Sequence, residues 1–246
     1  MKTLIKNIIY RLISFFRFPG TIILMYHSVG NNGEFFTVKP KDFERQMEYL
    51  YKKKFNVIRL TDMVNFLEKK IKPPRNSIVL TFDDGYEDNF TEVFKILKKF
   101  NFPATIFLST ALLDGKKTNK SGTSLNILNE KQIREMYNSG LFDFEPHTHN
   151  HRRLTEISID EAENEISRSK RIIEDMLDKK CVSFAYPYGA FNKEIAEMTK
   201  DHFRAILGVR KGRVDLSSDL FELKRNSVDS AVGQTQFRGI VRFGRI

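Results

Sequence analysis

The sequence predicts an α/β protein with parallel strands, and the expected architecture is a (β/α) barrel, complete or incomplete. Short apolar runs rich in β-branched residues alternate with segments of helical periodicity along most of the chain. This alternation is typical of parallel strands joined by crossover helices. About seven or eight such units follow one another without a linker or an internal repeat, which favours a barrel over the alternative, a doubly wound open sheet.

The individual elements follow from the spacing of the apolar residues. The expected strands are continuous apolar runs at residues 21–26, 56–60, 77–82, 104–109, 141–145, 183–186, 204–209 and 222–228. The expected helices are amphipathic segments at residues 41–53, 61–70, 87–100, 130–138, 158–177 and 193–200. The polar segment 114–126 breaks this pattern where a loop should lead from a strand to a helix. Such a loop forms a lid or substrate wall in barrel enzymes, or is a mobile surface segment.

Residues 1–18 predict an amphipathic, basic helix ahead of a domain formed by residues 19–246. Lys6 and Arg11 interrupt its apolar stretch, which makes it too short to span a bilayer, and it lacks the cleavage site of a signal peptide. We expect this helix to lie on an anionic membrane surface and to make the protein peripherally membrane-associated, on the cytoplasmic face or at the cell surface. The alternatives are a helix packed on the domain itself and a degenerate signal anchor.

The composition narrows the range of partners. The chain has 41 lysine and arginine residues against 31 acidic residues, and the net charge of +10 favours anionic partners. The basic residues are scattered and mostly follow amphipathic runs, as expected for solvated helix faces, so we expect no nucleic-acid partner. The lone Cys181 excludes an internal disulfide. The oligomeric state is not specified by the sequence.

Reactive side chains gather at the predicted carboxyl ends of four strands. The run TIILMYH ends in His27, IVLTFDD in Asp83 and Asp84, LFDFEPHTHNH in His147, His149 and His151, and SFAYPYG in Tyr188 and Gly189. Barrel enzymes carry their catalytic groups at this end of the strands. Four of the five histidines and the adjacent acid pair are therefore expected on one rim.

The histidine spacing and the acid pair together predict a metal site. His147 and His151 are four residues apart, which lets two imidazoles face one cation, and one carboxylate completes a three-ligand site with positions open for water. The histidine spacing alone is a weak signal, because ordinary loop histidines show it too. The pair Asp83 and Asp84 at a neighbouring strand end favours the metal site. We expect Zn²⁺, with Co²⁺ or Ni²⁺ as alternatives.

Two adjacent acids at such a site can have different roles. One ligates the metal, and the other stays off it and accepts a proton from the attacking water. A bound divalent ion lowers the pKa of water and polarises a carbonyl group, so the pattern predicts hydrolysis of an ester or amide. His27, at a third strand end, can protonate the leaving group. A structural histidine is the alternative for that position.

The motifs TFDDGY, HTHNH and FAYPYG, in this order, resemble the first three motifs of the polysaccharide deacetylase, or NodB-homology, family, which is carbohydrate esterase family 4. The resemblance extends over residues 21–228 and implies a distorted (β/α)7 barrel. It also implies a divalent metal ion and removal of acetyl groups from N-acetylated or O-acetylated sugars. The runs LMYHSVG and FAYPYG are similar to the circularly permuted branch that includes the poly-β-1,6-N-acetylglucosamine deacetylases.

The resemblance assigns roles to residues at the predicted metal site. Asp83 matches the general base, and Asp84, His147 and His151 match the metal ligands. In the permuted branch the general acid comes from the early Tyr-His strand, which implies this role for His27.

The same resemblance assigns the residues around the substrate. Tyr188 matches the residue whose backbone N–H holds the oxyanion. Thr148 matches the residue between the ligand histidines that orients the site or contacts acetate, and Tyr86 and Gly189 are expected on the substrate side. His149 does not match a ligand position and is expected to line the groove.

Three departures from the family pattern are visible. The third motif usually carries an arginine two residues before its proline, where it steadies the catalytic base, but this position is Ala185. The chain has no tryptophan and no leucine-x-histidine motif near its C-terminus. Arg225, in ELKRNSV, is the candidate to supply the missing positive charge.

The leading functional hypothesis is a metal-dependent hydrolase that removes N-acetyl groups from a GlcNAc-containing glycan or a lipid-linked sugar. The second is an O-acetyl esterase or cyclic-amide hydrolase on the same scaffold. The third, permitted by the missing arginine and tryptophan, is a non-catalytic, membrane-associated glycan-binding protein. The sugar, its polymer length and the native metal are not specified by the sequence.

Overall fold

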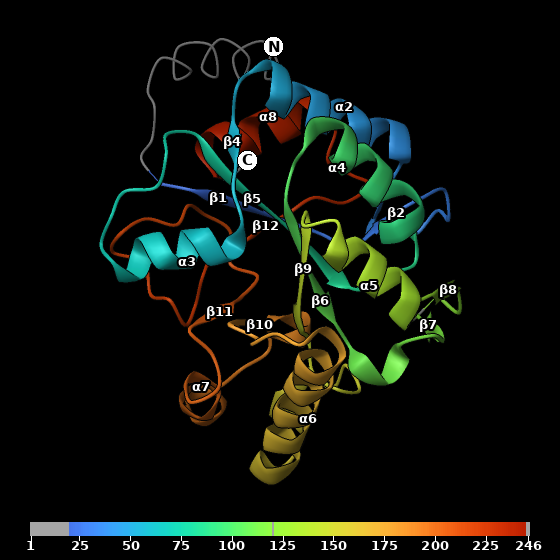
Figure 1. Cartoon of the computed structure of the whole chain (residues 1–246), viewed down its shortest axis with the longest axis vertical. Helices are drawn as coiled ribbons and strands as arrows, with labels where there is room; N and C mark the ends of the chain where they lie inside the picture. Colours follow the sequence, from blue (N-terminus) through green and yellow to red (C-terminus); the bar gives the residue numbers. More distant parts are fainter. Residues whose placement is uncertain (1–19, 120, 245–246) are drawn as a thin grey trace, which may run out of the picture.

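The computed structural model describes residues 20–119 and 121–244, and a curled parallel sheet lies at its centre (Figure 1). Neighbouring strands of this sheet follow the order β12-β1-β5-β6-β9. Their bounds are Ile22–Tyr26 for β1, Ser77–Asp84 for β5, Ala104–Leu108 for β6, Phe142–Pro146 for β9 and Asn226–Ser227 for β12. The short strand β4 (Asn56–Val57) pairs with the first residues of β5. The helix predicted for residues 1–18 lies outside the described residues.

The remaining parallel strands extend the sheet only in part, which distorts the barrel. Strand β10 (Ser183–Ala185) pairs with β11 (Ala205–Leu207) in a sheet of its own. A single parallel bridge between Leu207 and Leu223 links β11 to the segment that leads into β12. Within the described residues no ladder joins β9 to β10. The predicted α/β fold with a distorted, barrel-like arrangement of parallel strands is confirmed.

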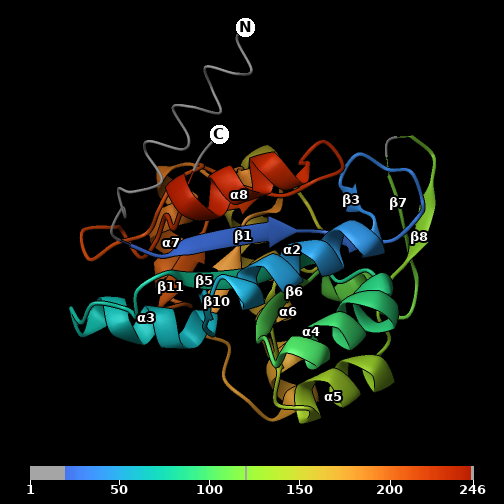
Figure 2. The same ribbon diagram turned by 90° about the horizontal axis from the view of Figure 1, so that it is seen from above.

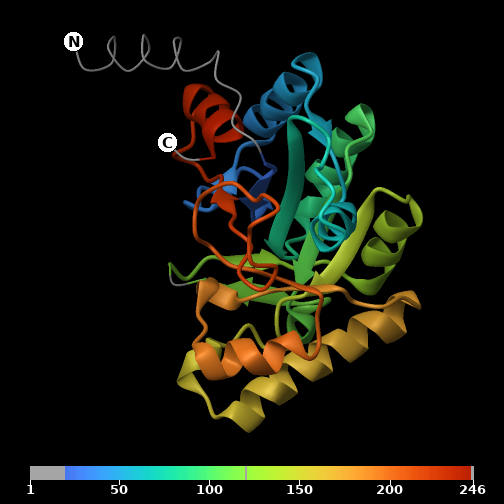
Figure 3. The same cartoon turned by 90° about the vertical axis from the view of Figure 1, so that its left-hand side faces the viewer.

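Helices surround the strands. Their bounds are Pro40–Lys52 for α2, Leu60–Glu68 for α3, Phe94–Phe100 for α4, Glu130–Asn138 for α5, Ile159–Leu177 for α6, Lys193–Lys200 for α7 and Gln234–Phe243 for α8. Helices α2 and α8 lie at one end of the molecule and α6 at the other in Figure 3, whereas Figure 2 shows α8 beside β1. No helix in the described ranges is long and apolar enough to cross a membrane.

Most predicted helices are found within a residue or two of their predicted ends. Helices α5 and α6 begin with capping boxes, in which Asn129 and Ser158 accept hydrogen bonds from the backbone of the third helical residue. Two differences stand out. The segment predicted as one helix from residue 87 starts instead with a π-helical turn, Asn89–Val93, and α8 was not predicted.

Short elements connect the strands at the carboxyl rim. The pairs β2 (Ser28–Val29) with β3 (Thr37–Val38) and β7 (Lys116–Thr118) with β8 (Ser124–Asn126) lie in the loops, together with 3-10 turns at Thr110–Leu112, Leu154–Glu156 and Pro187–Gly189. The β7–β8 pair is antiparallel and forms a hairpin within the segment predicted as a polar loop. That segment is therefore folded against the rim.

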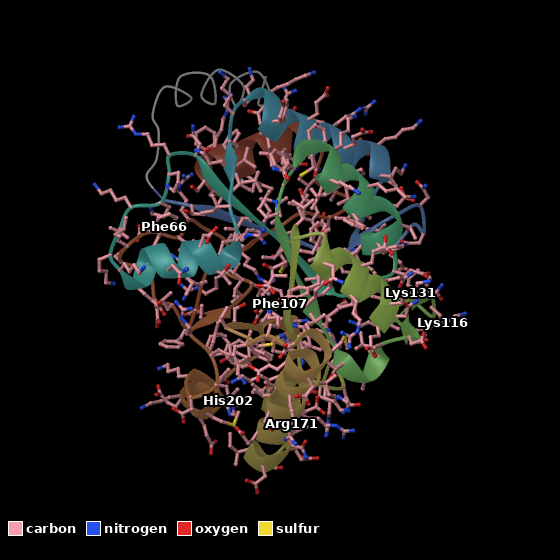
Figure 4. All side chains as sticks on the ribbon, in the orientation of Figure 1. Phe66, Phe107, Lys116, Lys131, Arg171 and His202 are labelled. Atoms are coloured by element: carbon pink, nitrogen blue, oxygen red, sulfur yellow. The ribbon has the colours of Figure 1, made fainter. Side chains whose placement is uncertain are left out.

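The two faces of the sheet belong to different apolar clusters. Leu80 and Phe82 of β5 pack with the surrounding helices, and Val79 packs with Phe107 and Leu207 in a smaller cluster. Figure 4 shows Phe107 in the middle of the molecule. Because alternate strand residues point to opposite faces, Asp83 shares the face of Val79 and points into the barrel.

A carboxylate replaces the missing ladder between β9 and β10. One oxygen of Glu145 accepts hydrogen bonds from the backbone N–H groups of Val182 and Ser183, each at 2.9 Å. The other oxygen accepts from Lys179 at 2.8 Å, and Lys179 also donates to the carbonyl of Phe144. Glu145 is buried, so these donors supply the hydrogen bonds that solvent would otherwise provide. The side chain thus joins two strands that the backbone leaves apart.

The Glu145→Ala variant should lose about 3 kcal/mol of unfolding free energy, because it leaves two buried backbone donors without an acceptor and removes one of the three acceptors of the buried Lys179 ammonium, whose others are Asp143 and the carbonyl of Phe144. Urea denaturation of both proteins measures this difference. The matched control is Glu48→Ala, which removes an exposed ion pair with Lys52 and should change stability by less than about 1 kcal/mol. Equal effects of the two substitutions would contradict a joining role for Glu145.

Candidate metal centre and catalytic site

Three predicted ligands converge at the carboxyl rim. Asp84 ends β5, whereas His147 and His151 follow β9. The Nε2 atoms of His147 and His151 lie 3.7 and 2.9 Å from Oδ1 of Asp84, and one ligand atom from each of the three residues lies within 4.8 Å of the others. This donor set of two imidazoles and one carboxylate, which we call the triad, fits a divalent ion.

His147 is fixed in the form that a metal requires. Its Nδ1 lies 2.7 Å from the carbonyl oxygen of Ala185, and a carbonyl can only accept, so this nitrogen carries the proton. The lone pair of Nε2 therefore faces Asp84. Burial lowers the pKa of His147 to about 3, so the ring is neutral at physiological pH. A backbone carbonyl that orients a ligand imidazole in this way is typical of metal sites.

Asp84 is ionised although it is buried. Burial alone would raise its pKa, but Lys117 and His151 hold the pKa well below its usual range. The Nζ atom of Lys117, from β7, lies 2.8 Å from Oδ1 of Asp84. The nitrogen atoms of Lys117, His147 and His151 thus lie 2.8, 3.7 and 2.9 Å from one carboxylate oxygen.

The neighbouring Asp83 has a different partner. Its two oxygens accept hydrogen bonds from Arg225 at 2.6 and 2.8 Å, and the Nε of Arg225 donates to the carbonyl of Gly208 at 2.9 Å. Arg225 is fully buried, with its guanidinium over the ring of Phe107. Despite its burial, the pKa of Asp83 is lowered, with Arg225 the principal cause. Arg225 therefore supplies a positive charge beside the acid that was predicted as the base, while Ala185 is buried in the apolar cluster of Phe107.

His27 follows β1 on the same rim. Its positive charge, when protonated, contributes to lowering the pKa of both Asp83 and Asp84, and its ring lies 6.0 Å from that of Phe36. The buried side chain of Asn89 donates to the carbonyl of His27 at 3.0 Å. Asn89 opens the π-helical turn, so this irregular turn helps to hold the strand end that carries His27.

Residues 147–151 form the histidine loop, which is held by residues outside the predicted motifs. His149 turns away from the triad, with its Nδ1 2.8 Å from the hydroxyl of Thr110. Glu165 of α6 accepts two hydrogen bonds from Asn150, both at 2.7 Å. Thr148, between the ligands, is fully buried, and its hydroxyl has no hydrogen-bond partner within the described residues.

Four residues of the rim adopt left-handed backbone conformations that non-glycine residues avoid. The φ angles are 75° at Asp84, 64° at Thr148, 56° at His151 and 61° at Tyr188. Each such residue costs energy that the surrounding structure must offset, and such strain is concentrated at functional sites. At the adjacent Gly189, with φ of 63°, a Cβ atom would lie 2.4 Å from the side chain of Val209. The conformation of this turn therefore requires glycine.

Aromatic rings flank the triad on two sides. The ring of Tyr188 packs edge-on against His151, with 4.9 Å between the ring centres. The guanidinium of Arg153 lies over the ring of Tyr188, 4.5 Å from its centre. On the opposite flank Tyr86 is buried beside Asp84, and its pKa is raised above its usual range by burial and by that carboxylate. Phe36 stacks on Tyr86 at 5.5 Å, and the neighbouring Phe35 is 74% exposed.

The family described as polysaccharide deacetylase matches residues 70–204, which contain Asp83, Asp84 and the histidine loop. The chain belongs to the polysaccharide deacetylase family. Its members are hydrolases, and the arrangement around Asp84 is in agreement with that class.

Relatives support the same family. The poly-β-1,6-N-acetyl-D-glucosamine N-deacetylase of Staphylococcus epidermidis is 28% identical over 209 residues, which cover 81% of this chain and 71% of the relative. YxkH of Bacillus subtilis, named for the same family, is 27% identical over 216 residues, which cover 87% of this chain and 74% of YxkH. The predicted resemblance to this branch is confirmed.

Solved structures support the fold. The deacetylase PplD of Streptococcus pyogenes, solved in complex with acetate, superposes with a TM-score of 0.79 at 24% identity and covers 90% of this chain and 98% of PplD. IcaB of Ammonifex degensii also gives a TM-score of 0.79, at 20% identity, over 94% of this chain and 99% of IcaB. The distorted barrel of this chain is therefore the fold of the deacetylases.

The sequence predicts residues of the candidate site but not the side chains that support them. The nine predicted site residues lie on strand ends or turns of one rim, and His149 alone of the motif histidines points elsewhere. The supports that it missed are Lys117, Asn89 and Glu165. No local pattern marks them, because their partners are distant in the sequence. The fifth histidine, His202, pairs with Glu163 away from the rim.

The Arg225→Ala variant should lower the rate of acetate release at neutral pH by about 100-fold or more, because Asp83 loses the cation that orients it and keeps it ionised. Since Arg225 lowers the pKa of Asp83, its removal should move the acidic limb of the kcat/KM profile to higher pH. Steady-state rates across a pH series measure both effects.

A matched set of variants separates this role from general damage. Arg225→Lys keeps the charge but loses the two-pronged geometry and should lie between wild type and Arg225→Ala. Arg210→Ala removes an exposed partner of Glu222 and should leave the profile unchanged. Turnover of folded Arg225→Ala within a few-fold of wild type would exclude the assigned role.

Proposed function

We propose that the protein is a metal-dependent N-deacetylase that acts on a GlcNAc-containing glycan or a lipid-linked sugar. One observation carries this proposal: beside the triad, a second ionised carboxylate, Asp83, is held by Arg225. A binding protein does not need a buried base next to a metal site. A hydrolase does, because the attacking water must lose a proton.

Asp84, His147 and His151 are the residues that would hold the ion, and Zn²⁺ is the proposed species, with Co²⁺ or Ni²⁺ as alternatives. The neutral His147, the ionised Asp84 and the compact donor set fit such an ion. When bound, a divalent ion polarises the acetyl carbonyl and lowers the pKa of water.

The residues of the chain then have distinct tasks. Asp83 takes a proton from the attacking water while the oxygen of that water bonds to the acetyl carbon. The backbone N–H of Tyr188 stabilises the negative charge that develops on the acetyl oxygen. His27 donates a proton to the amide nitrogen as the C–N bond breaks, which leaves acetate and a free amino sugar. Thr148, Tyr86 and Gly189 are proposed to shape the acetyl pocket.

The flanks of the triad suit a sugar polymer. Phe35 on one side and Tyr188 on the other are 74% and 53% exposed, respectively, although both are aromatic. Exposed aromatic residues beside a catalytic site offer flat apolar surfaces to a ligand. The name of the Staphylococcus epidermidis relative states an N-acetylglucosamine polymer as its substrate, and we propose a substrate of the same class for this chain.

Paired variants of the acid and the ligand test this function. Asp83→Asn should reduce acetate release from N-acetylglucosamine oligomers by about 1,000-fold, because the base is lost, while bound zinc is retained. His147→Ala should lose both zinc and activity, because a buried ligand is lost. Metal analysis measures the zinc content of each variant, and an acetate assay measures its activity before chelation, after chelation and after zinc readdition.

The same assay has clear contradicting outcomes. Undiminished acetate release by Asp83→Asn would refute the role of the base. Acetate release from O-acetyl sugars alone would identify an esterase, and glycan binding without acetate release would identify a non-catalytic protein. Asp88→Asn is unsuitable as a control because Asp88 bonds Ser28 near the site, so the exposed Asp62→Asn serves instead.

We further propose that residues 1–18 attach the protein peripherally to an anionic membrane surface. The pattern of these residues and the net charge of +10 support the attachment. Gly20 precedes β1, whereas His27 and the site lie beyond its other end, about 17 Å further along the strand. An attachment through residues 1–18 would therefore join the barrel at the end opposite the site.

Removal of residues 1–18 should release the protein from the membrane fraction, because the basic, apolar segment is lost. Sedimentation with vesicles that contain or lack anionic lipid measures binding of both forms. Acetate release by the shortened protein from soluble oligomers should stay within about twofold of wild type. Equal vesicle binding by the two forms would contradict the proposal.

A further inference from the structure

The hairpin β7–β8 brings a lysine into contact with a proposed metal ligand. The Nζ atom of Lys117 lies 2.8 Å from Oδ1 of Asp84, the same oxygen that faces His147 and His151. Its ammonium also lies 6.0 Å from the ring centre of Tyr86. The side chain is only 16% exposed, so this ion pair is shielded from solvent.

The contact between Lys117 and Asp84 follows from the fold of the hairpin, because the backbone that carries Lys117 is fixed next to Asp84. The base of the hairpin is bonded to the turn that follows Asp84: Leu128 N–H donates to the carbonyl of Gly85, and Glu87 N–H donates to that of Asn126, both at 2.9 Å. The tip is held from the other side, where the hydroxyl of Ser121 donates to Glu34 at 2.8 Å. The backbone around Lys117 is therefore fixed at both ends, and the flexible part is its four-carbon side chain.

An ammonium and a divalent ion compete for this oxygen. Both need the negative charge of Asp84, and two cations on one carboxylate oxygen repel each other strongly in a shielded site. A metal ion can enter the triad only when the Lys117 side chain leaves Asp84. Because the hairpin holds the lysine nearby, the competing charge is always present at a high local concentration.

We propose that Lys117 is a tethered competitor that sets the affinity of the triad for its divalent ion. The lysine neutralises Asp84 when no metal is bound, and every metal ion that binds must displace it. The consequence is a site that binds its ion more weakly than the same three ligands would without the lysine. This inference rests on the metal site of the proposed function.

The test compares metal affinity in variants of the full chain. Lys117→Met removes the charge but keeps the length of the side chain, and its affinity for Zn²⁺ should be about tenfold higher than that of wild type. Lys117→Gln should give the same direction and serves as the second variant if the first does not fold. The affinity is measured by calorimetric titration of the chelated protein with zinc chloride, and by the visible absorption of bound Co²⁺.

Two controls match the substitution. Lys116→Met changes the neighbouring residue of the same strand, whose side chain lies at the edge of the molecule in Figure 4, and should stay within twofold of wild type. Lys117→Arg keeps the charge and should not bind zinc more tightly. The metal-free Lys117→Met protein should also melt at a lower temperature than metal-free wild type, because Asp84 loses a partner, while its gain on zinc addition should be larger.

The outcomes separate this inference from the proposed function. If wild type binds zinc and Lys117→Met binds it within twofold of the wild-type affinity, the competitor role is overturned and the metal site stands. If wild type binds neither zinc nor cobalt, and His147→Ala behaves identically, both the metal site and the inference fail. An increase in affinity that Lys116→Met shares would also overturn the inference, because it would reflect net charge alone.

Discussion

Two adjacent carboxylates buried at the end of β5 are the constraint on which the site depends. Like charges cannot be buried side by side unless each has its own cation or a proton. Asp83 pairs with Arg225, whereas Asp84 pairs with Lys117 and faces the histidine loop. The two acids therefore have different partners and different roles, although they are neighbours in sequence. One acid remains free of the triad and the other forms part of it, which is the division that metal-assisted hydrolysis requires.

This division is maintained by the parallel arrangement of the strands. Strands β1, β5 and β9 run in the same direction, so His27, the acid pair and the ligand histidines all emerge on one rim. Asp84, Thr148 and His151 then adopt strained left-handed conformations there. The strain is offset by side-chain contacts from elsewhere in the chain, such as the two hydrogen bonds of Glu165 to Asn150.

The sequence specified those parts of the site that depend on local pattern. The strands that lead to Asp84 and His147 could be predicted, because buried parallel strands are continuous apolar runs. The extension of β5 through Asp83 and Asp84 was missed because two acids do not resemble a strand, although both pair with β6. Helix α8 was missed as well: Gly239 lowers its helical propensity, and its apolar face is short. The hairpin that carries Lys117 has only three residues in each strand, so tertiary contacts decide its structure.

The measurement that tests this account most directly is X-ray diffraction at the zinc absorption edge from crystals of the full chain soaked in zinc chloride. The account predicts one strong anomalous peak among Asp84, His147 and His151, with Asp83 still bonded to Arg225 and outside the coordination shell. A peak bound by Asp83, or no peak at the triad when zinc is bound elsewhere, would contradict the separation of ligand and base.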